Sequence, residues 1–463
     1  MFQATAGDGA MWKAWRRLPI RKAYNSGDWA TAAALARREL MTGNRAFAQD
    51  IILRSLYNQQ AWQEVLDFIR EHPEADDGRY ERRVNLKLAQ IRQTEHGEPT
   101  PSEEKAWNEE DLLKNWVQED HRVWLRHPWG WTHWDMPKGY DLASTHPALL
   151  HLAMQVLLGP WVKATKQWSV EQRQPGQRLG LAYSGGVDST AALLLLPDDT
   201  VLAYHQRNFD SMLSHTLPLA TFAAIKERTG REVLSIPSNH ERIRTYHGKP
   251  NGFSDAHASG VHLILLADHL DLGGIAFGTP IDNTWLKKGS FYRDFSADPY
   301  WATSRAMFAK AGLAYVLPIN HISEAGALEV CRQSVLADVV NSCLRGVGEQ
   351  WCGRCWKCFH KNGPLGRDFD PKAPEITTFL NTKPLRTAQH ALWALQVQQL
   401  EHLAPHLGVH LQSDLSWWAE AYPPGLALID EPWRATVEAR TDAMLKRMRQ
   451  PYPLESVHID TSV

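Results

Sequence analysis

Hydrophobic positions along the chain follow three patterns, which predict three structurally different parts. Residues 1–93 and 371–450 carry apolar positions at helical spacing, broken by short polar turns. Between these parts, from Arg178 onward, apolar runs of strand length alternate with segments long enough for helices. This alternation predicts an α/β core with a doubly wound parallel sheet over residues 178–365, flanked by mainly α-helical N- and C-terminal domains.

The N-terminal part contains an internal repeat. Tyr24 and Trp29 recur as Tyr57 and Trp62, at an offset of 33 residues, which is close to the period of tetratricopeptide-like helix hairpins. Two copies are too few for an autonomous solenoid, so two similar core helices are an equal alternative. Because stacked helix pairs often hold a partner on one face, a protein partner is one expectation for residues 1–93.

Two polar breaks lie between the N-terminal part and the predicted core. TEHGEPTPSEE (94–104) contains prolines and is typical of a linker, and EQRQPGQ (171–177) forms the second break. Residues 105–170 lie between them and are rich in tryptophan, and we expect this segment to be mainly helical. Its aromatic side chains could stack on a base, but packing between domains is their more frequent role.

Composition and charge narrow the classes of partner. Apolar residues make up 43% and charged residues 22% of the 463-residue chain, and the formal net charge is −2. Without a strong positive charge, nucleic acid is a disfavoured partner. No apolar stretch reaches the length of a membrane span, and the first residues lack the apolar core of a signal peptide. We therefore expect a cytoplasmic protein with no membrane partner.

The stretch AYSGGVDST (182–190) lies where a predicted strand gives way to a predicted helix. Gly185 and Gly186 would let the main chain approach a phosphate, while the neighbouring hydroxyl groups and the helix N-terminus would bind it. Asp188 would repel a phosphate directly, so we interpret it as a ligand of a bridging Mg²⁺. The spacing matches neither GxxxxGK[ST] nor GxGxxG. The plainer alternative is a serine–glycine turn with an Asp–Ser helix cap.

Four of the five cysteines form a cluster with the spacing Cys-x8-Cys-x2-Cys-x2-Cys: Cys343, Cys352, Cys355 and Cys358. In a reducing compartment such clustering predicts a metal site rather than disulfides. Four thiolates would complete a tetrahedral shell around Zn²⁺, which is typical of a structural site. An iron–sulfur cluster is the alternative. Cys331 lies outside the cluster on a predicted helix, and we expect it to be a small core residue rather than a nucleophile.

Three motifs follow one another along the predicted core. Residues 184–190 match SGGxDS[ST], residues 204–207 read YHQR, and the cysteine cluster contains CGxC. The first resembles the PP-loop of N-type ATP pyrophosphatases. The second resembles the YGQRH segment of the 7-cyano-7-deazaguanine synthase (QueC) family, with departures at His205 and Asn208, and the third resembles the zinc site of that family. The resemblance implies a PP-loop ATPase core of the HUP (adenine nucleotide alpha hydrolase-like) fold, with ATP, Mg²⁺ and Zn²⁺ as cofactors.

The resemblance also implies an activity. QueC-type enzymes adenylate the carboxylate of 7-carboxy-7-deazaguanine, release pyrophosphate, add ammonia to form an amide, and convert the amide to a nitrile. The large helical parts suggest a second acceptor, a protein amine, because QueC-like proteins with such additions occur in anti-phage defence operons. Two alternatives stay open, a PP-loop enzyme that thiolates or amidates tRNA and a non-catalytic scaffold that binds nucleotide.

Residue roles follow from the same resemblance. The catalytic candidates are Ser184, Asp188, Ser189 and Arg207. The candidates for binding ATP are Ser184, Gly185, Gly186, Val187, Asp188, Ser189, Thr190, Tyr204, Gln206 and Arg207.

The sequence departs from the family in the loops expected to hold the substrate, NGFSDAHASG and GTPIDNTWLKKGSFYRDF. Asp255 and His257 begin a predicted helix and could face the cleft, although a helix cap is the plainer role for Asp255. His360, beyond the last cysteine, is expected in an exposed loop. The substrate candidates in the second divergent loop are Asp282, Asn283, Trp285, Lys287, Lys288 and Arg293, with a solvated charged loop as the alternative.

Overall fold

The chain divides into two compact units, Met1–Ser102 with Arg244–Asn251, and Glu103–Ile243 with Gly252–Val463. The computed structural model describes residues 18–462 except 77, 79, 82, 85, 86, 89–99, 103, 104, 210–214, 344 and 347–349. Most of the predicted linker 94–104 therefore lies outside the described residues. Within the described part of the chain, every helix is too short or too polar to cross a lipid bilayer.

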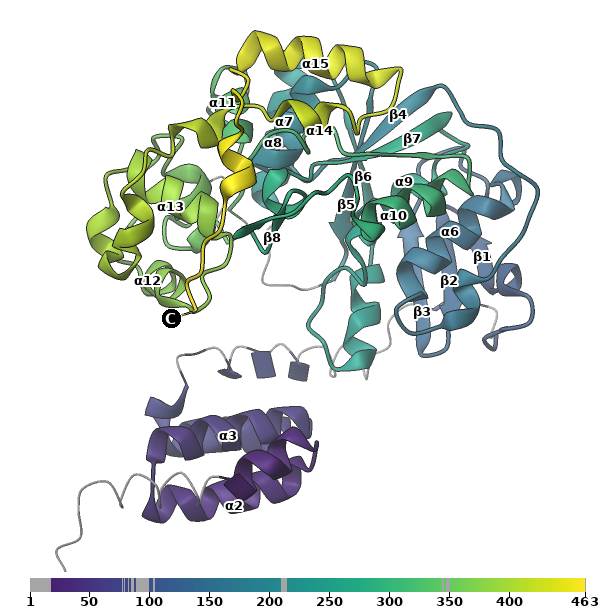
Figure 1. The fold of residues 1–463 in the computed structure, drawn as a ribbon. Helices are drawn as coiled ribbons and strands as arrows, with labels where there is room; N and C mark the ends of the chain where they lie inside the picture. The colour runs from purple at the N-terminus through teal and green to yellow at the C-terminus, as the bar shows by residue number, and fades with distance from the viewer. Residues whose placement is uncertain are drawn as a thin grey trace, which may run out of the picture. The chain divides into compact units, whose positions relative to one another are not determined.

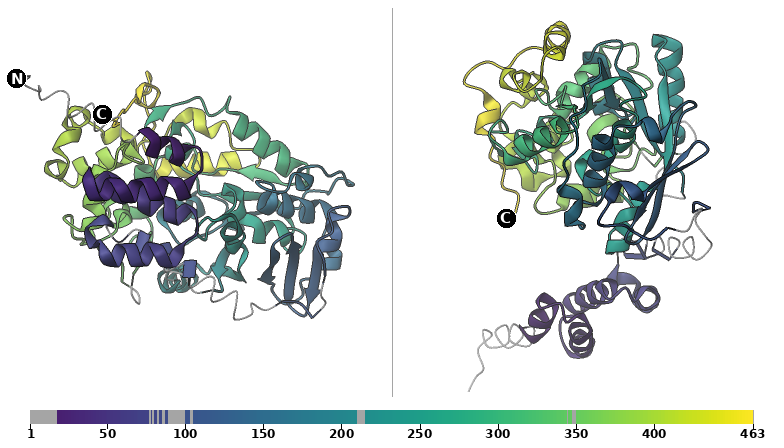
Figure 2. Two further views of the ribbon diagram at one scale, coloured as in Figure 1. Left: turned by 90° about the horizontal axis from the view of Figure 1, so that it is seen from below. Right: turned by 90° about the vertical axis from the view of Figure 1, so that its right-hand side faces the viewer.

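The first unit contains antiparallel helices that share one apolar core. Its described elements include a helix over residues 18–25, α2 (Trp29–Thr42), α3 (Arg45–Asn58), α4 (Trp62–Glu71) and η1 (Pro73–Ala75). Figure 2 shows these helices packed side by side. The side chains of Asp28 and Asn44 accept hydrogen bonds at the starts of α2 and α3, which satisfies amide groups that the helices leave free. Ala36, Ile52 and Val65 lie in the buried core.

The sequence repeat marks two equivalent helix–turn–helix junctions in this unit. Tyr24 and Trp29 lie on either side of the turn before α2, and Tyr57 and Trp62 lie on either side of the turn before α4. The rings of Tyr57 and Trp62 meet edge to face, with centroids 5.2 Å apart. The two copies also touch, because Asn58 donates a hydrogen bond of 3.2 Å to the hydroxyl of Tyr24.

The second unit is built on an eight-stranded, mostly parallel sheet with the order β1-β2-β3-β6-β5-β4-β7-β10 (Figure 1). Its strands are β1 (Trp116–Glu119), β2 (Arg122–His127), β3 (Gly130–Asp135), β4 (Arg178–Ala182), β5 (Val201–Arg207), β6 (Val233–Ser238), β7 (Leu272–Phe277) and β10 (Ala314–Val316). A short separate hairpin pairs β8 (Leu286–Lys287) with β9 (Phe291–Tyr292). From β6 to β10 all neighbours are parallel, and β4 pairs with both β5 and β7. Strand order reverses at β4 and β7, and a parallel sheet of this kind opens a crevice there.

Helices cover both faces of this sheet, as the register of β4 and β7 shows. Leu179 pairs with Gly274, and a Cβ at Gly274 would meet Trp433 of α15. The adjacent Gly180 faces the other way, and a Cβ there would meet Leu263 of α9. The α-helices of this unit are α6 (Pro147–Leu158), α7 (Val187–Leu195), α8 (Thr216–Thr229), α9 (Val261–Leu265), α10 (Pro299–Ala309), α11 (Glu324–Arg332), α12 (Pro374–Asn381), α13 (Ala388–Val397), α14 (Pro423–Leu426) and α15 (Trp433–Met444). The prediction of an α/β fold is confirmed at this level.

The tryptophan-rich segment differs from the expectation of a mainly helical structure over 105–170. Residues 116–135 form the antiparallel strands β1, β2 and β3, and β3 joins β6 of the parallel sheet through the pair Trp134 and Ser238. Tryptophan, valine and threonine favour pleated strands, where a large side chain packs against its cross-strand neighbour. Trp134 is fully buried, so packing rather than base stacking accounts for it.

The C-terminal helices are part of the second unit rather than a separate domain. Apolar side chains of β4, such as Leu181, belong to the same continuous core as Ile429 and Val437 from the C-terminal part. The described α/β core therefore begins before Arg178 and extends beyond residue 365, since strands from 116 and helices to 444 pack around one sheet. Apolar pattern alone could not show this, because it does not reveal which elements share a core.

Candidate functional site

The glycine turn connects the end of β4 to the start of α7. Gly185 has φ +76°, a conformation that favours glycine, and a Cβ there would meet Pro218 and Phe222 at 3.3 Å. The turn folds back on the helix, because Ser189 Oγ accepts a hydrogen bond from the Ser184 amide at 3.2 Å and lies 3.0 Å from Ser184 Oγ. The turn is therefore held in place by its own side chains, at the carboxyl end of β4.

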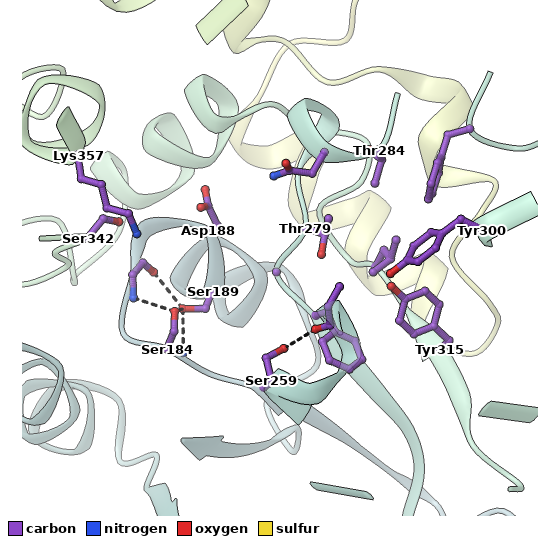
Figure 3. Close-up of a pocket in the computed structure, with 18 of the residues that line it drawn as sticks. Ser184, Asp188, Ser189, Ser259, Thr279, Thr284, Tyr300, Tyr315, Ser342 and Lys357 are labelled. Carbon is purple, nitrogen blue, oxygen red and sulfur yellow. Dashed lines mark hydrogen bonds between the residues drawn. The ribbon is translucent and has the colours of Figure 1, made fainter. Parts of the chain in front are cut away.

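A cavity of about 830 Å³ opens at the carboxyl ends of β4, β7 and β10 (Figure 3). This volume is in the range of about 300–1,000 Å³ that small-molecule sites occupy. The cavity has two chemically different ends. Figure 3 shows Ser184, Asp188 and Lys357 at one end and Tyr300 and Tyr315 at the other. The lining residues at the polar end are Ser184, Gly186, Asp188, Ser189, Asn341, Ser342 and Lys357, and the aromatic lining residues are Phe277, Phe295, Tyr300 and Tyr315.

Asp188 belongs to a charged network that continues behind the cavity. Lys361 Nζ donates a hydrogen bond of 2.7 Å to Asp188 Oδ1 and lies 2.8 Å from Glu324 Oε2. Asp282 Oδ2 in turn accepts a hydrogen bond of 2.8 Å from the Glu324 amide. One buried ammonium group therefore serves two carboxylates, and a third carboxyl group lies next to them.

The pKa values of the two inner carboxyl groups move in opposite directions. Burial and the negative charge of Glu324 raise the pKa of Asp282 well above its ordinary value, which favours the protonated form. Burial alone would also raise the pKa of Glu324, but Lys361, His390 and His360 together outweigh it and lower that pKa below the ordinary value. The network thus holds Glu324 ionised beside Lys361, with Asp282 as the neutral neighbour.

Only two of the six predicted substrate residues, Asn283 and Arg293, line the cavity. Asp282 is buried in the network, and Trp285 is buried against Phe295 and Tyr422. Lys287 and Lys288 are exposed and are absent from the residues that line the cavity. The physical reason is the β8–β9 hairpin, which turns the middle of this loop away while both of its ends stay at the cavity. Arg293 is fixed there by hydrogen bonds to the carbonyl of Thr284 and to Asp298, both 2.6 Å.

Arg207 is absent from the residues that line the large cavity. Its guanidinium donates a hydrogen bond of 2.7 Å to the buried Glu241, which also contacts His205 Nε2 at 3.1 Å. Together with Ser184 and Tyr204, these side chains border a separate hollow of about 150 Å³. Burial raises the pKa of Tyr204 to about 12. Arg207 is thus paired with Glu241 beside a hollow that shares Ser184 with the large cavity, and its role in catalysis and ATP binding stays a prediction.

The remaining predicted ATP residues support the turn rather than face the cavity. Val187 is buried, and its amide donates a hydrogen bond of 3.0 Å to Ser342 Oγ. Thr190 is buried as well, and its hydroxyl lies 2.9 Å from the hydroxyl of Tyr183. Gln206, on β5, is half-buried and lines neither cavity.

The four clustered cysteines come together as a possible metal site. The Sγ atoms of Cys355 and Cys358 are 3.6 Å apart, those of Cys352 and Cys358 are 3.8 Å apart, and those of Cys343 and Cys355 are 4.0 Å apart. Zinc–sulfur bonds of about 2.3 Å in a tetrahedron place sulfur atoms about 3.8 Å from one another. The arrangement therefore fits Zn²⁺. Cys331 lies apart and buried, as expected of a core residue.

The same segment that carries the cysteines also supplies positive charge to the cavity. The π-helical turn η8 (Cys358–Asn362) begins at the last cysteine and places Lys361 in the charged network, while Lys357 lines the cavity. His360, expected in an exposed loop, is fully buried, because this turn packs its ring against Phe379 and His390.

Glu324, His360 and His390 form a second group of potential metal ligands. Lys361 Nζ already lies 2.8 Å from Glu324 Oε2, and His390 Nε2 lies 3.1 Å from the carbonyl oxygen of His360, to which it donates. A cation at this place would meet an ammonium group and a nitrogen that is engaged as a donor. We therefore assign the group to the ion-pair network.

Several lining residues were not foreseen from the sequence. Lys357 lies within the cysteine cluster and so carried a local signal, whereas Tyr315 lies inside a strand rather than at its carboxyl end. Ser342 and Tyr300 lie far along the chain from the glycine turn and carried no local signal.

Comparisons with known proteins name no function. A model described as a family of unknown function (DUF6395) matches residues 303–451, which include the cysteine cluster but not the glycine turn. No curated protein and no solved structure matches this chain.

Proposed function

We propose that this protein is an ATP-dependent ligase that adenylates a carboxylate and then transfers the acyl group to nitrogen. The observation that carries the proposal is the position of the SGGVDST turn, at the start of α7 and in the wall of the 830 Å³ cavity. Helix N-termini and glycine-rich turns bind phosphate, and the crevice at a strand-order reversal is where α/β sheets bind nucleotides. The motif resemblance to PP-loop ATPases supports ATP as the nucleotide, with AMP and pyrophosphate as products.

The polar end of the cavity suits a triphosphate and its metal. Ser184 and Ser189 offer hydroxyl groups, and Lys357 offers a positive charge. Asp188 would hold Mg²⁺, which would neutralise phosphate charge as pyrophosphate leaves. Lys361 would stay paired with Asp188 Oδ1 and Glu324 Oε2, which leaves Asp188 Oδ2 for the metal.

The aromatic end of the cavity suits a planar substrate. Phe277, Phe295, Tyr300 and Tyr315 offer ring faces and edges, and Asn283 and Arg293 offer polar contacts at the rim. A deazapurine carboxylate such as 7-carboxy-7-deazaguanine has this shape and charge. The nitrogen acceptor would be ammonia or a protein amine, and the helical first unit would present a protein partner.

Sulfur transfer to RNA is a poorer match to the site. Such a reaction needs a reactive thiolate, whereas burial raises the pKa of Cys331 and its Sγ faces the Val187 carbonyl oxygen at 3.5 Å. The other four cysteines lie together in the cluster.

The test is product analysis with ATP, 7-carboxy-7-deazaguanine and ammonium chloride. We expect AMP and pyrophosphate to form only when the carboxylate is present. Asp188→Ala should lower AMP formation roughly 100-fold or more, because charge stabilisation at the phosphates is lost. Asp199→Ala, an exposed carboxylate beyond the other end of α7, is the matched control and should retain wild-type rates. Intact ATP with this carboxylate would contradict the proposed substrate.

A further inference from the structure

Behind the aromatic end of the cavity, His257 and Tyr300 connect the half-buried carboxylate of Asp255 to the cavity surface. Asp255 caps η6 (Ala256–Gly260), and its Oδ1 accepts a hydrogen bond of 2.9 Å from the His257 amide. The same oxygen contacts Nδ1 of the His257 ring. On the other side of the ring, His257 Nε2 lies 3.2 Å from the Tyr300 hydroxyl and 3.0 Å from Ser304 Oγ.

These contacts define the tautomer and the orientation of the imidazole ring. A carboxylate at Nδ1 favours the tautomer with the proton on that nitrogen, so Nε2 is left as a hydrogen-bond acceptor. The ring is held in place by Tyr300, which stacks on it at 5.4 Å and 20°, and by Phe308 and Tyr315. His257 is buried, which fixes the direction in which Nε2 accepts a proton.

Of the two hydroxyl groups at Nε2, one reaches the cavity. Tyr300 lines the cavity and is 40% exposed, whereas Ser304 is 2% exposed and is not among the lining residues. Figure 3 shows the hydroxyl of Tyr300 pointing toward that of Tyr315 at the cavity wall. Burial, followed by the charge of Asp255, raises the pKa of Tyr300, so the group is a neutral hydroxyl that can accept and donate a proton together.

We propose that Tyr300, with His257 and Asp255 behind it, removes the proton from the nitrogen nucleophile. The proposal rests on the proposed function and concerns its second step. As the C–N bond forms, the nitrogen proton passes to the Tyr300 oxygen and the Tyr300 hydroxyl proton passes to His257 Nε2. The C–O bond to AMP breaks, and its electron pair leaves with the AMP phosphate. Asp255 stabilises the imidazolium ion that results.

The roles of the three residues differ. Tyr300 is the catalytic residue because it would touch the nucleophile. His257 and Asp255 act through it, as proton acceptor and positioning residue. Adenylation itself needs no proton transfer from nitrogen, so the relay should affect the second step alone.

The test separates the two steps with three assays on the full chain. Adenylation is followed as carboxylate-dependent exchange of labelled pyrophosphate into ATP, and acyl transfer is followed with ammonium chloride. Hydroxylamine replaces ammonium in the third assay, because this stronger nucleophile is unprotonated at neutral pH and its attack depends less on a base.

We expect Tyr300→Phe and His257→Gln to keep the rate of pyrophosphate exchange near that of the wild type. The rate of transfer to ammonia should fall about 100-fold in both. Transfer to hydroxylamine should be largely retained. Asp255→Asn keeps the helix cap, and its rate of transfer to ammonia should fall less. Ser304→Ala, which removes the buried hydroxyl at the same nitrogen, is the matched control and should behave as wild type.

The outcomes separate the two proposals. Pyrophosphate exchange in every variant, together with wild-type rates of transfer to ammonia, would overturn the relay but not the proposed function. Equal losses with ammonia and hydroxylamine would also overturn it, since they would show a structural role. No exchange in the wild type with this carboxylate would overturn the proposed function and, with it, the relay.

Discussion

At the scale of single residues, Lys361 connects the glycine turn to the interior. Its ammonium group is buried between Asp188 and Glu324, and it neutralises charge that the interior would otherwise leave unpaired. The folded pKa of Glu324 lies below its ordinary value, so the stability this group contributes is present above the unfolded pKa. It is lost only as the pH falls through the lower, folded value.

Lys361→Met should therefore destabilise the second unit in a pH-dependent way. Removing one partner of a buried ion pair costs about 3–5 kcal/mol, since the remaining carboxylates stay buried and unpaired. Without the ammonium group the pKa of Glu324 rises, and protonation at acid pH removes the unpaired charge. The stability gap between variant and wild type should narrow from pH 7 to pH 5 in urea unfolding.

Lys357→Met is the matched control for this prediction, because it removes a positive charge from the cavity wall rather than from the buried network. It should change the free energy of unfolding by about 0.5 kcal/mol or less. A difference in the free energy of unfolding between Lys361→Met and the wild type that widens at acid pH would contradict the assigned ion-pair network.

At the scale of elements, the cysteine cluster and η8 act together. The cluster holds the start of η8, and three residues after Cys358 the same turn delivers Lys361 to Asp188. A metal bound by the cysteines would therefore support the cavity from a distance, without contacting the substrate.

Cys355→Ser should abolish binding of zinc, expected at one ion per chain, because the tetrahedral set loses a thiolate. The remaining cysteines should become reactive toward a thiol reagent, and pyrophosphate exchange should fall as Lys361 loses its position. Metal content by elemental analysis and thiol titration check this independently of activity. The control variant Cys331→Ala, changed outside the cluster, should still bind zinc. Loss of metal from this control would count against the four cysteines as the zinc site.

At the scale of the whole molecule, the two units have separate cores. Ile52 is fully buried in the first unit, and Ile264 is fully buried in the second, where it belongs to the core that surrounds the sheet. The candidate site consists of residues of the second unit only, from Ala182 to Lys357.

Ile52→Ala and Ile264→Ala should accordingly have different effects. Each should cost about 2–5 kcal/mol of stability in its own unit, since a buried aliphatic side chain is removed. Pyrophosphate exchange at low temperature should survive in Ile52→Ala. In Ile264→Ala, thermal inactivation should occur at a lower temperature than in the wild type. Calorimetry with parallel activity measurements checks both, and equal loss of activity in the two variants would argue against separate cores.

The parts that sequence predicted well are those with local signals. The glycine turn needs Gly185 at positive φ, the strand β4 is a short apolar run, and the four cysteines lie close along the chain. The strands of the tryptophan-rich segment were missed, because closely spaced aromatic residues mask the alternation that marks a strand. The hydrogen bond from Arg207 to Glu241 could not be foreseen either, since a motif does not show which partner its side chain meets.

The sequence by itself determined the α/β class, the strand-to-helix turn at 182–190 and the residues of the four-cysteine cluster, because each depends on residues near one another in the chain. Only the tertiary structure decided what surrounds them. Lys361 reaches Asp188 across 173 positions, and Tyr300 meets His257 across 43. Such contacts depend on how the sheet and its helices pack, and packing is a property of the whole core rather than of any local stretch.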